Sequence, residues 1–219
     1  MREKLIYALS AVAAILLVSN LHTILNVLPD EANQGAMYRI MFFHIPSWWT
    51  AGLALMVAVG TSIAYLVTGK LKYDAITVSV TEVAVVFLFI GLSTGMIWGR
   101  IIWGIWWTWD ARLTSAFVCT LLYGSYLLLR NGIADPTQRA KISAAFNLFA
   151  FADVPIVWFS IRWWRTQHPQ PMTLPADMWR ALLLNWLFLI ILMVVFVLLR
   201  LRQEEARRDL DGLRRLAHA

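Results

Sequence analysis

Charged residues and cysteine are both scarce in this chain of 219 residues, and each scarcity excludes a class of protein. Only 15% of the residues are charged and 60% are hydrophobic, a composition far from that of a soluble domain. The single cysteine, Cys119, can form no internal disulfide and is interpreted as a small buried hydrophobic residue. The arginines of 207–215 alternate with acidic residues and lack the density of a polybasic arm, so we expect no nucleic-acid partner.

Long hydrophobic runs dominate the chain, and six of them approach the ~20 residues that an α-helix needs to cross a bilayer. They cover approximately residues 5–25, 48–67, 75–97, 113–129, 142–161 and 179–199. The first run is too long for a cleaved signal peptide and has no convincing cleavage site. Asp153 and Pro155 interrupt the fifth run, where Pro155 is expected to kink the helix. We predict an all-α integral membrane protein, in which 1–219 forms one bundle of six transmembrane helices in the lipid bilayer.

The distribution of Lys and Arg predicts the orientation of this bundle. Six spans place both termini on one side, and that side carries about twice as many Lys and Arg residues as the other. Because an excess of these residues marks the cytoplasmic side, both termini and the tail 200–219 are predicted to be cytoplasmic. The connections 26–47, 98–112 and 162–178 then share the opposite, extracytoplasmic face.

The connection 98–112 is unusually rich in tryptophan. Its aromatic and charged residues are Trp98, Trp103, Trp106, Trp107, Trp109, Arg100, Arg112 and Asp110. An aromatic belt that anchors the bundle is one interpretation, but a belt distributes its aromatic residues over all helix ends. The spacing of Trp103, Trp106 and Trp107 predicts one face of a short helix that lies in the membrane interface. We therefore favour a platform for a large, flat, apolar and anionic ligand.

Two histidines lie on the same predicted face as this platform. His44 lies in the connection 26–47, and His168 lies in the connection 162–178. Two neutral imidazoles suit the iron of a haem, although a single interfacial histidine is more often an ordinary residue with a water or backbone partner. His22, near the outer end of the first span, is a reserve candidate.

Charged side chains near this face offer partners for a ligand that carries carboxylates. The four candidate arginines are Arg39, Arg100, Arg112 and Arg162. An arginine fork pairs with carboxylates such as the propionates of haem, but Arg100 or Arg112 could instead pair with Asp110 and fix the loop. Within the spans, Glu82 and Asp153 have no cation at their predicted depth, so we expect neutral acids that are hydrogen-bonded across helices.

The segment from Trp98 to Ser115 resembles the tryptophan-rich WWD signature of haem-handling proteins, and the match is to the CcmC branch. Three further motifs carry the same resemblance: Tyr38-Arg39 with His44-Ile45-Pro46, Val154-Pro155-Ile156, and Trp163-Trp164 with His168. The resemblance extends from about Gln34 to the last span.

This resemblance implies a bacterial inner-membrane protein of cytochrome c maturation that binds haem b transiently and non-covalently at the periplasmic face. It makes His44 and His168 the axial ligands of the iron and places the segment 98–112 against the haem. It also implies presentation of the haem to the chaperone CcmE, with the ABC-type subunits CcmA and CcmB and the small CcmD as further partners. The chain has no P-loop pattern, so ATP hydrolysis is expected in a partner and the chain itself is expected not to be an enzyme.

Two other functions fit parts of the pattern. A haem b subunit of a membrane quinol oxidoreductase usually carries paired histidines within its spans, whereas no histidine here lies at the predicted centre of the bilayer. A permease for another amphipathic solute could also use an aromatic mouth, and 130–141 is a weak candidate for its cytoplasmic coupling helix.

Overall fold

The computed structural model describes residues 2–168 and 173–217. Residue 1, part of the predicted connection 162–178 and the end of the predicted tail 200–219 therefore lie outside the described residues. The long helices are α1 (Arg2–His22), α2 (Met41–Thr68), α3 (Leu71–Trp103), α4 (Ala111–Asn131), α5 (Pro136–Phe151), α6 (Asp153–Trp163) and α7 (Ala176–Ala217). A π-helical turn, η1 (Thr23–Val27), and a 3-10 helix, η2 (Ala36–Ile40), lie between α1 and α2.

Six segments of the described chain are helical, long and apolar enough to cross a membrane. They are Arg2–Val27, Ala36–Thr68, Leu71–Trp103, Ala111–Asn131, Pro136–Trp163 and Ala176–Arg214. The prediction of an all-α integral membrane protein with six transmembrane helices is confirmed.

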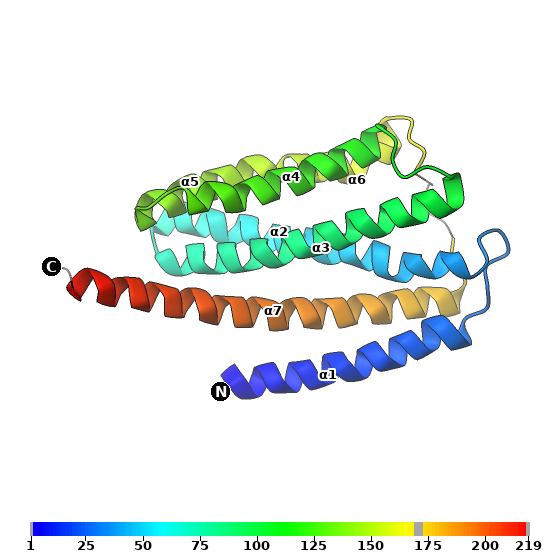
Figure 1. The fold of residues 1–219 in the computed structure, drawn as a ribbon, viewed down its shortest axis with the longest axis horizontal. Coiled ribbons are helices and arrows are strands. Elements are labelled where there is room, and N and C mark those ends of the chain that lie inside the picture. The colour runs from blue at the N-terminus through cyan, green and yellow to red at the C-terminus, as the bar shows by residue number, and fades with distance from the viewer. Residues whose placement is uncertain (1, 169–172, 218–219) are drawn as a thin grey trace.

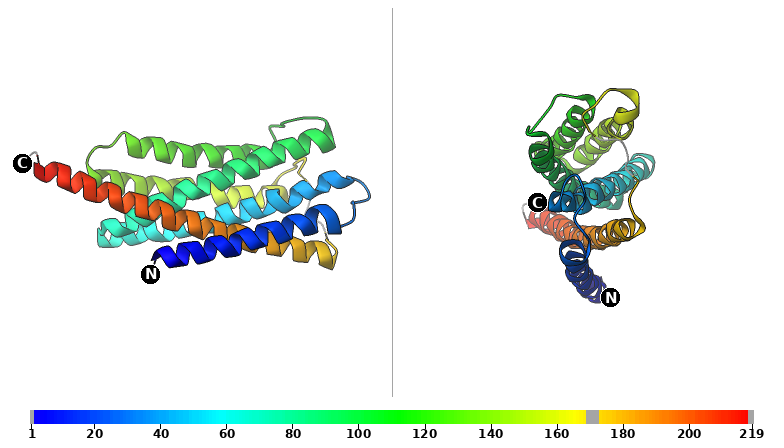
Figure 2. Two further views of the ribbon diagram at one scale, coloured as in Figure 1. Left: turned by 60° about the horizontal axis from the view of Figure 1, so that its bottom comes forward. Right: turned by 90° about the vertical axis from the view of Figure 1, so that its right-hand side faces the viewer.

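The helices form layers with α2 and α3 at the centre (Figure 1). α4, α5 and α6 cover one side of this antiparallel pair, α7 covers the other side, and α1 packs outermost against α7. The end-on view in Figure 2 shows the same order. Ala51, Ala54 and Ala84 are completely buried, and such small residues let neighbouring membrane helices approach closely.

The two ends of the bundle carry different parts of the chain. Both termini and the α2–α3 and α4–α5 turns lie towards one end, which we call the terminus end (Figure 1). The α1–α2, α3–α4 and α6–α7 connections lie at the other end, which we call the connection end. Three connections that are far apart in the sequence therefore lie close to one another in space.

Helix boundaries depart from the hydrophobic runs at two places near the site. α2 begins at Met41 rather than near residue 48, so His44 lies inside its first turns. The fifth span is divided at Ala152, which leaves Pro155 in the first turn of α6. A proline there breaks no internal helical hydrogen bond, because the first backbone N–H groups of a helix have no partner within it.

The length of α7 changes the surroundings of Glu82. Arg200 continues the last transmembrane helix, and its Nη2 donates a hydrogen bond of 2.8 Å to Oε1 of Glu82 on α3. The prediction of a neutral Glu82 with no cation at its depth is therefore wrong, because α7 continues through the residues that were predicted to be a tail. Within the described residues, Oδ2 of Asp153 is buried without a hydrogen-bond partner.

Candidate functional site

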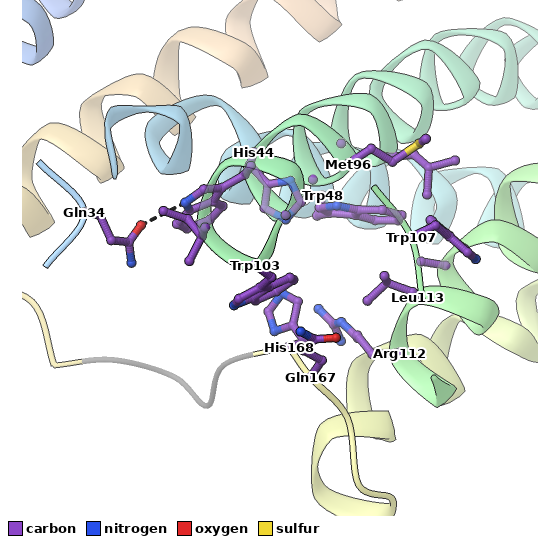
Figure 3. Close-up of a pocket in the computed structure, with 17 residues that line it drawn as sticks. Gln34, His44, Trp48, Met96, Trp103, Trp107, Arg112, Leu113, Gln167 and His168 are labelled. Carbon is purple, nitrogen blue, oxygen red and sulfur yellow. Dashed lines mark hydrogen bonds between the residues drawn. The ribbon is translucent and has the colours of Figure 1, made fainter. Parts of the chain in front are cut away.

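A cavity of about 170 Å³ lies at the connection end, between α2, α3, α4 and the segment that follows α6 (Figure 3). His44 from α2 and His168 from the segment after α6 both line this cavity. Its aromatic wall consists of Trp48, Trp98, Trp103 and Trp107. The two histidines that the sequence analysis selected thus share one cavity with most of the predicted tryptophan platform.

Hydrogen bonds orient the imidazole of His44, which is only 8% exposed. Its Nδ1 lies 3.2 Å from Oγ1 of Thr94 on α3, and the Thr94 hydroxyl itself donates to the carbonyl of Ile90 at 2.7 Å. Because the hydroxyl proton is used in that bond, Thr94 accepts a hydrogen bond from Nδ1–H. The proton therefore belongs on Nδ1, and Nε2 retains the lone pair that a metal ion requires.

Two glycines of α3 let side chains of α2 approach its backbone. A Cβ atom at position 95 would lie 2.8 Å from Cε1 of His44, and a Cβ atom at position 91 would lie 2.7 Å from Nε1 of Trp48. Gly91 and Gly95 are four residues apart, so they lie on the same face of the helix. Because this face of α3 has no side chains at Gly91 and Gly95, His44 and Trp48 of α2 can pack directly against its backbone.

Two tryptophans of the cavity wall differ in how their indole N–H groups are satisfied. Trp98 Nε1 donates to Oε1 of Gln34 at 2.9 Å, and its ring contacts His44 edge-on with centroids 5.8 Å apart. Trp107 Nε1 is buried and has no hydrogen-bond partner among the residues described. A buried donor without an acceptor is costly, so this indole adds an unsatisfied polar group to the cavity wall.

The tryptophan segment does not form the predicted interfacial helix. α3 ends at Trp103 because Gly104 adopts a left-handed conformation with φ of 74°, and α4 begins only at Ala111. The residues between them are extended or bent, so the prediction of one helical face through Trp103, Trp106 and Trp107 is wrong. Trp106 does not line the cavity and is 55% exposed.

Trp109 also lies outside the cavity, and its side chain is 75% exposed. Its ring packs edge-on against Trp107, with centroids 5.7 Å apart, and both rings contact Phe117 of α4. The segment therefore has two faces, one towards the cavity and one outwards.

Asp110 links the tryptophan segment to the segment that carries His168. Its Oδ1 caps α4 by accepting from the backbone N–H of Leu113 at 2.9 Å. Its Oδ2 accepts from the Thr166 hydroxyl at 2.8 Å and from the Gln167 backbone N–H at 2.9 Å. We call these last two hydrogen bonds the Asp110 tether.

The hydrogen bonds also set the charge state of Asp110. Partial burial raises the pKa of this carboxyl, but the hydrogen bonds from Leu113, Gln167 and Thr166 lower it by more, so the net pKa is below its usual value. No ion pair joins Asp110 to an arginine within the described residues, so the alternative in which Arg100 or Arg112 braces it is not seen.

Of the four candidate arginines, only Arg112 lines the cavity, where its Nη1 donates to the carbonyl of Val157. Arg39 instead fastens the α1–α2 connection, by donating to the carbonyls of Ile24 and Leu28 at 2.7 and 2.8 Å and pairing with Asp30. Arg100 donates to the carbonyl of Gly104, and Arg162 is exposed at the end of α6. The structure thus places one of these cations at the cavity and the other three outside it.

Several lining residues were missed by the sequence analysis, and some of them had a visible signal. The sequence Gly91-Leu-Ser-Thr94-Gly95 inside a membrane span combines two small residues four apart with a hydroxyl, a pattern typical of close helix packing. Trp48 and Gln34 had no such signal, because their contact with the site depends on how α2 and its preceding connection fold against α3.

Fold and site together define a multi-pass membrane protein with an aromatic, two-histidine cavity at one end of its bundle. The chain belongs to the heme exporter protein C family, whose model matches residues 1–215.

Curated bacterial relatives agree with this assignment. Heme exporter protein C of Bradyrhizobium diazoefficiens is 36% identical over 140 residues, which cover 64% of this chain and 53% of the relative. The proteins of the same name from Escherichia coli K12 and Haemophilus influenzae are 34% and 33% identical over 141 residues, which cover 64% of this chain and 57% of each relative. The matched stretch therefore spans little more than half the length of these relatives.

Proposed function

We propose that this protein binds haem b in the cavity, transiently and non-covalently, and presents it to the haem chaperone CcmE during cytochrome c maturation. The observation that carries the proposal is the convergence of His44 and His168 on one tryptophan-walled cavity. The names of the relatives, heme exporter protein C, support a haem-handling role.

The residues of the cavity suit each part of a haem molecule. His44 offers Nε2 to the iron, and His168 from the other segment is the second axial ligand. The tryptophan walls match the apolar porphyrin face, as expected for indole rings. Arg112 supplies a cation for a propionate carboxylate.

Haem is cargo in this proposal, so the site must release it. Only one ligand, His44, is supplied by a long helix, whereas His168 is held by a short segment that the Asp110 tether fastens. Loss of the second ligand would then weaken binding without unfolding the bundle. The exposed Trp106 and Trp109 give the outer face of the tryptophan segment an aromatic surface for contact with CcmE.

The proposed setting is the bacterial inner membrane, with both termini cytoplasmic and the cavity on the periplasmic side. CcmA, CcmB and CcmD are the proposed partners in addition to CcmE. The chain is proposed to handle haem rather than to catalyse a reaction, with ATP hydrolysis in the ABC-type partner.

The absorption spectrum of the purified protein, loaded with haem, tests the proposal. We expect a low-spin haem spectrum that is lost when His44→Ala and His168→Ala are combined. His22→Ala removes an exposed histidine from the same end of the bundle and should leave the spectrum unchanged. Transfer of haem to added CcmE should follow in the parent protein. A low-spin spectrum that survives the double substitution would reject the site, and quinol-driven redox cycling without transfer would favour an oxidoreductase subunit.

A further inference from the structure

A second, polar cavity lies at the terminus end of the bundle, where α3, α4, α5 and α7 meet. Its volume is about 50 Å³. The charged residues that line it are Arg130, Arg139, Arg200, Arg207, Glu82 and Glu204. Nothing in the proposed haem function uses this cavity, since the two histidines lie at the opposite end of the bundle.

The acidic residues around this cavity already have arginine partners. Asp74 accepts two hydrogen bonds from Arg130, at 2.6 and 3.1 Å, and one from Arg208 at 2.8 Å. Glu204 accepts from Arg208 at 3.1 Å, and one of its oxygens lies 3.6 Å from Nη2 of Arg200.

Glu82 is the third acid, and Arg200 holds it through two nitrogens. Asp74, Glu82 and Glu204 are therefore matched by Arg130, Arg200 and Arg208.

Arg139 and Arg207 are two further cations, beyond the three arginines that pair with acidic residues. No ion pair is formed by either side chain with the residues that the structure describes. Nε of Arg139 is also buried without a hydrogen-bond partner. A buried cationic donor without an acceptor is unfavourable, so the cavity is short of negative charge and of acceptor atoms. Arg207 is exposed and gives a ligand access from the surface.

The size and donors of the cavity indicate the ligand class. A water molecule needs roughly 10–15 Å³ of such volume, so the space suits a ligand group of about three to five heavy atoms. Guanidinium forks match the oxygens of a phosphate group. Basic pockets between transmembrane helices near the membrane surface are sites where phospholipid headgroups bind.

We propose that this cavity is a phosphate-binding site in which Arg139 and Arg207 hold the oxyanion. The phosphate is supplied by the headgroup of an anionic phospholipid or by free phosphate. The occupied site would join α5 to α7, because Arg139 and Arg207 belong to those two helices.

Thermal unfolding of the purified full-length protein tests this site, with tryptophan fluorescence as the signal. Phosphatidylglycerol should raise the midpoint, and phosphatidylcholine at the same concentration should raise it less. A rise with inorganic phosphate as well identifies free phosphate as a ligand, whereas a rise with phosphatidylglycerol alone identifies the lipid headgroup. Absence of any rise with either anion overturns the proposal.

Matched variants distinguish a specific phosphate site from general electrostatic attraction of anions to a basic surface. Arg139→Gln with Arg207→Gln should abolish the rise. Arg202→Gln removes a charge from the same helix, at an exposed residue that pairs with Glu3, and should retain the rise. An equal loss in Arg202→Gln, or a full rise in the double variant, overturns the proposal.

Should the double variant not fold, Arg207→Gln alone replaces only an exposed side chain and should weaken the apparent affinity several-fold. An unchanged affinity in this single variant also overturns the proposal. The haem spectrum is expected to be the same in all these variants, which distinguishes failure of this site from failure of the haem site.

Discussion

At the terminus end, the three acidic residues of the charged cluster are held by arginines, whereas at the connection end the metal-binding nitrogen of a buried histidine is left without a proton. Asp74 and Arg130 form a buried two-bond ion pair, with side chains only 4% and 6% exposed. At the aromatic cavity, by contrast, the hydrogen bond from Nδ1 of His44 to Thr94 leaves Nε2 as the acceptor nitrogen. A buried ion pair therefore stabilises the terminus end, whereas the histidine at the connection end keeps an acceptor nitrogen for a metal ion.

The largest expected effect follows from breaking the buried ion pair at the terminus end. Asp74→Ala leaves the buried Arg130 guanidinium without its carboxylate, and removal of one partner of a buried pair typically costs about 3–5 kcal/mol. The free energy of unfolding in detergent measures this change. Glu3→Ala, which breaks the exposed pair with Arg202, should cost less than about 1 kcal/mol. Equal losses in the free energy of unfolding for the two substitutions would show that the buried pair stabilises the fold no more than the exposed pair does.

A smaller effect is expected from closing the glycine face at the connection end. Gly95→Ala places a Cβ atom 2.8 Å from Cε1 of His44, so the imidazole must move away from its present orientation. We expect haem affinity to fall roughly 10–100-fold, the range found when support of a metal ligand is disturbed. Haem titration followed by absorbance measures the affinity.

Gly60→Ala is the matched control for this substitution, because a Cβ atom at position 60 of α2 meets nothing within 4 Å. It should leave haem affinity unchanged and stabilise the helix by up to about 1 kcal/mol. Equal haem affinity in the Gly95 and Gly60 variants would contradict the role assigned to the close approach of His44.

The smallest effect is expected from the Asp110 tether. Asp110→Ala releases Thr166 and Gln167 and leaves His168 less well positioned, so haem affinity should fall about tenfold, or about 1.4 kcal/mol. Thr108→Val is the control, because Thr108 makes only a long hydrogen bond of 3.4 Å to Asp110 and none to the described residues of the His168 segment. A tenfold loss of haem affinity in Thr108→Val as well would show that any change in this loop weakens binding, so the tether would have no specific role.

The pH dependence of the tether follows from the lowered pKa of Asp110. Because the folded-state pKa lies below the unfolded value, the carboxylate contributes stability above the unfolded pKa, and this contribution is lost as the pH falls through the folded pKa. The ratio of haem affinities between the parent protein and Asp110→Ala should therefore be the same at ~pH 7 and ~pH 5. A ratio that approaches one at the lower pH would contradict the lowered pKa.

The sequence predicted the apolar parts of this molecule better than the details of its connections. Hydropathy identified six spans, and the shared face of His44, His168 and the tryptophan segment led to the cavity. The spacing of Trp103, Trp106 and Trp107 suggested a helix, but Gly104 ends α3 and Asp110 caps the start of α4. These local signals are stronger than the spacing.

Long-range contacts could not be predicted in the same way. Arg200 was assigned to a tail because hydropathy falls after residue 199, although helix-forming residues continue α7 to Ala217. Its pairing with Glu82 depends on the packing of α7 beside α3, which a single sequence does not reveal. Arg39, Arg100 and Arg162 lie outside the cavity for a different reason, because their positions depend on the local folding of the connections.

Electron paramagnetic resonance of the ferric haem-loaded protein shows whether His44 and His168 ligate the same iron. We expect one low-spin signal in the parent protein and its replacement by a high-spin signal in each of His44→Ala and His168→Ala, because each variant loses one strong axial ligand. A low-spin signal that persists unchanged in either single variant would contradict ligation of one iron by both histidines.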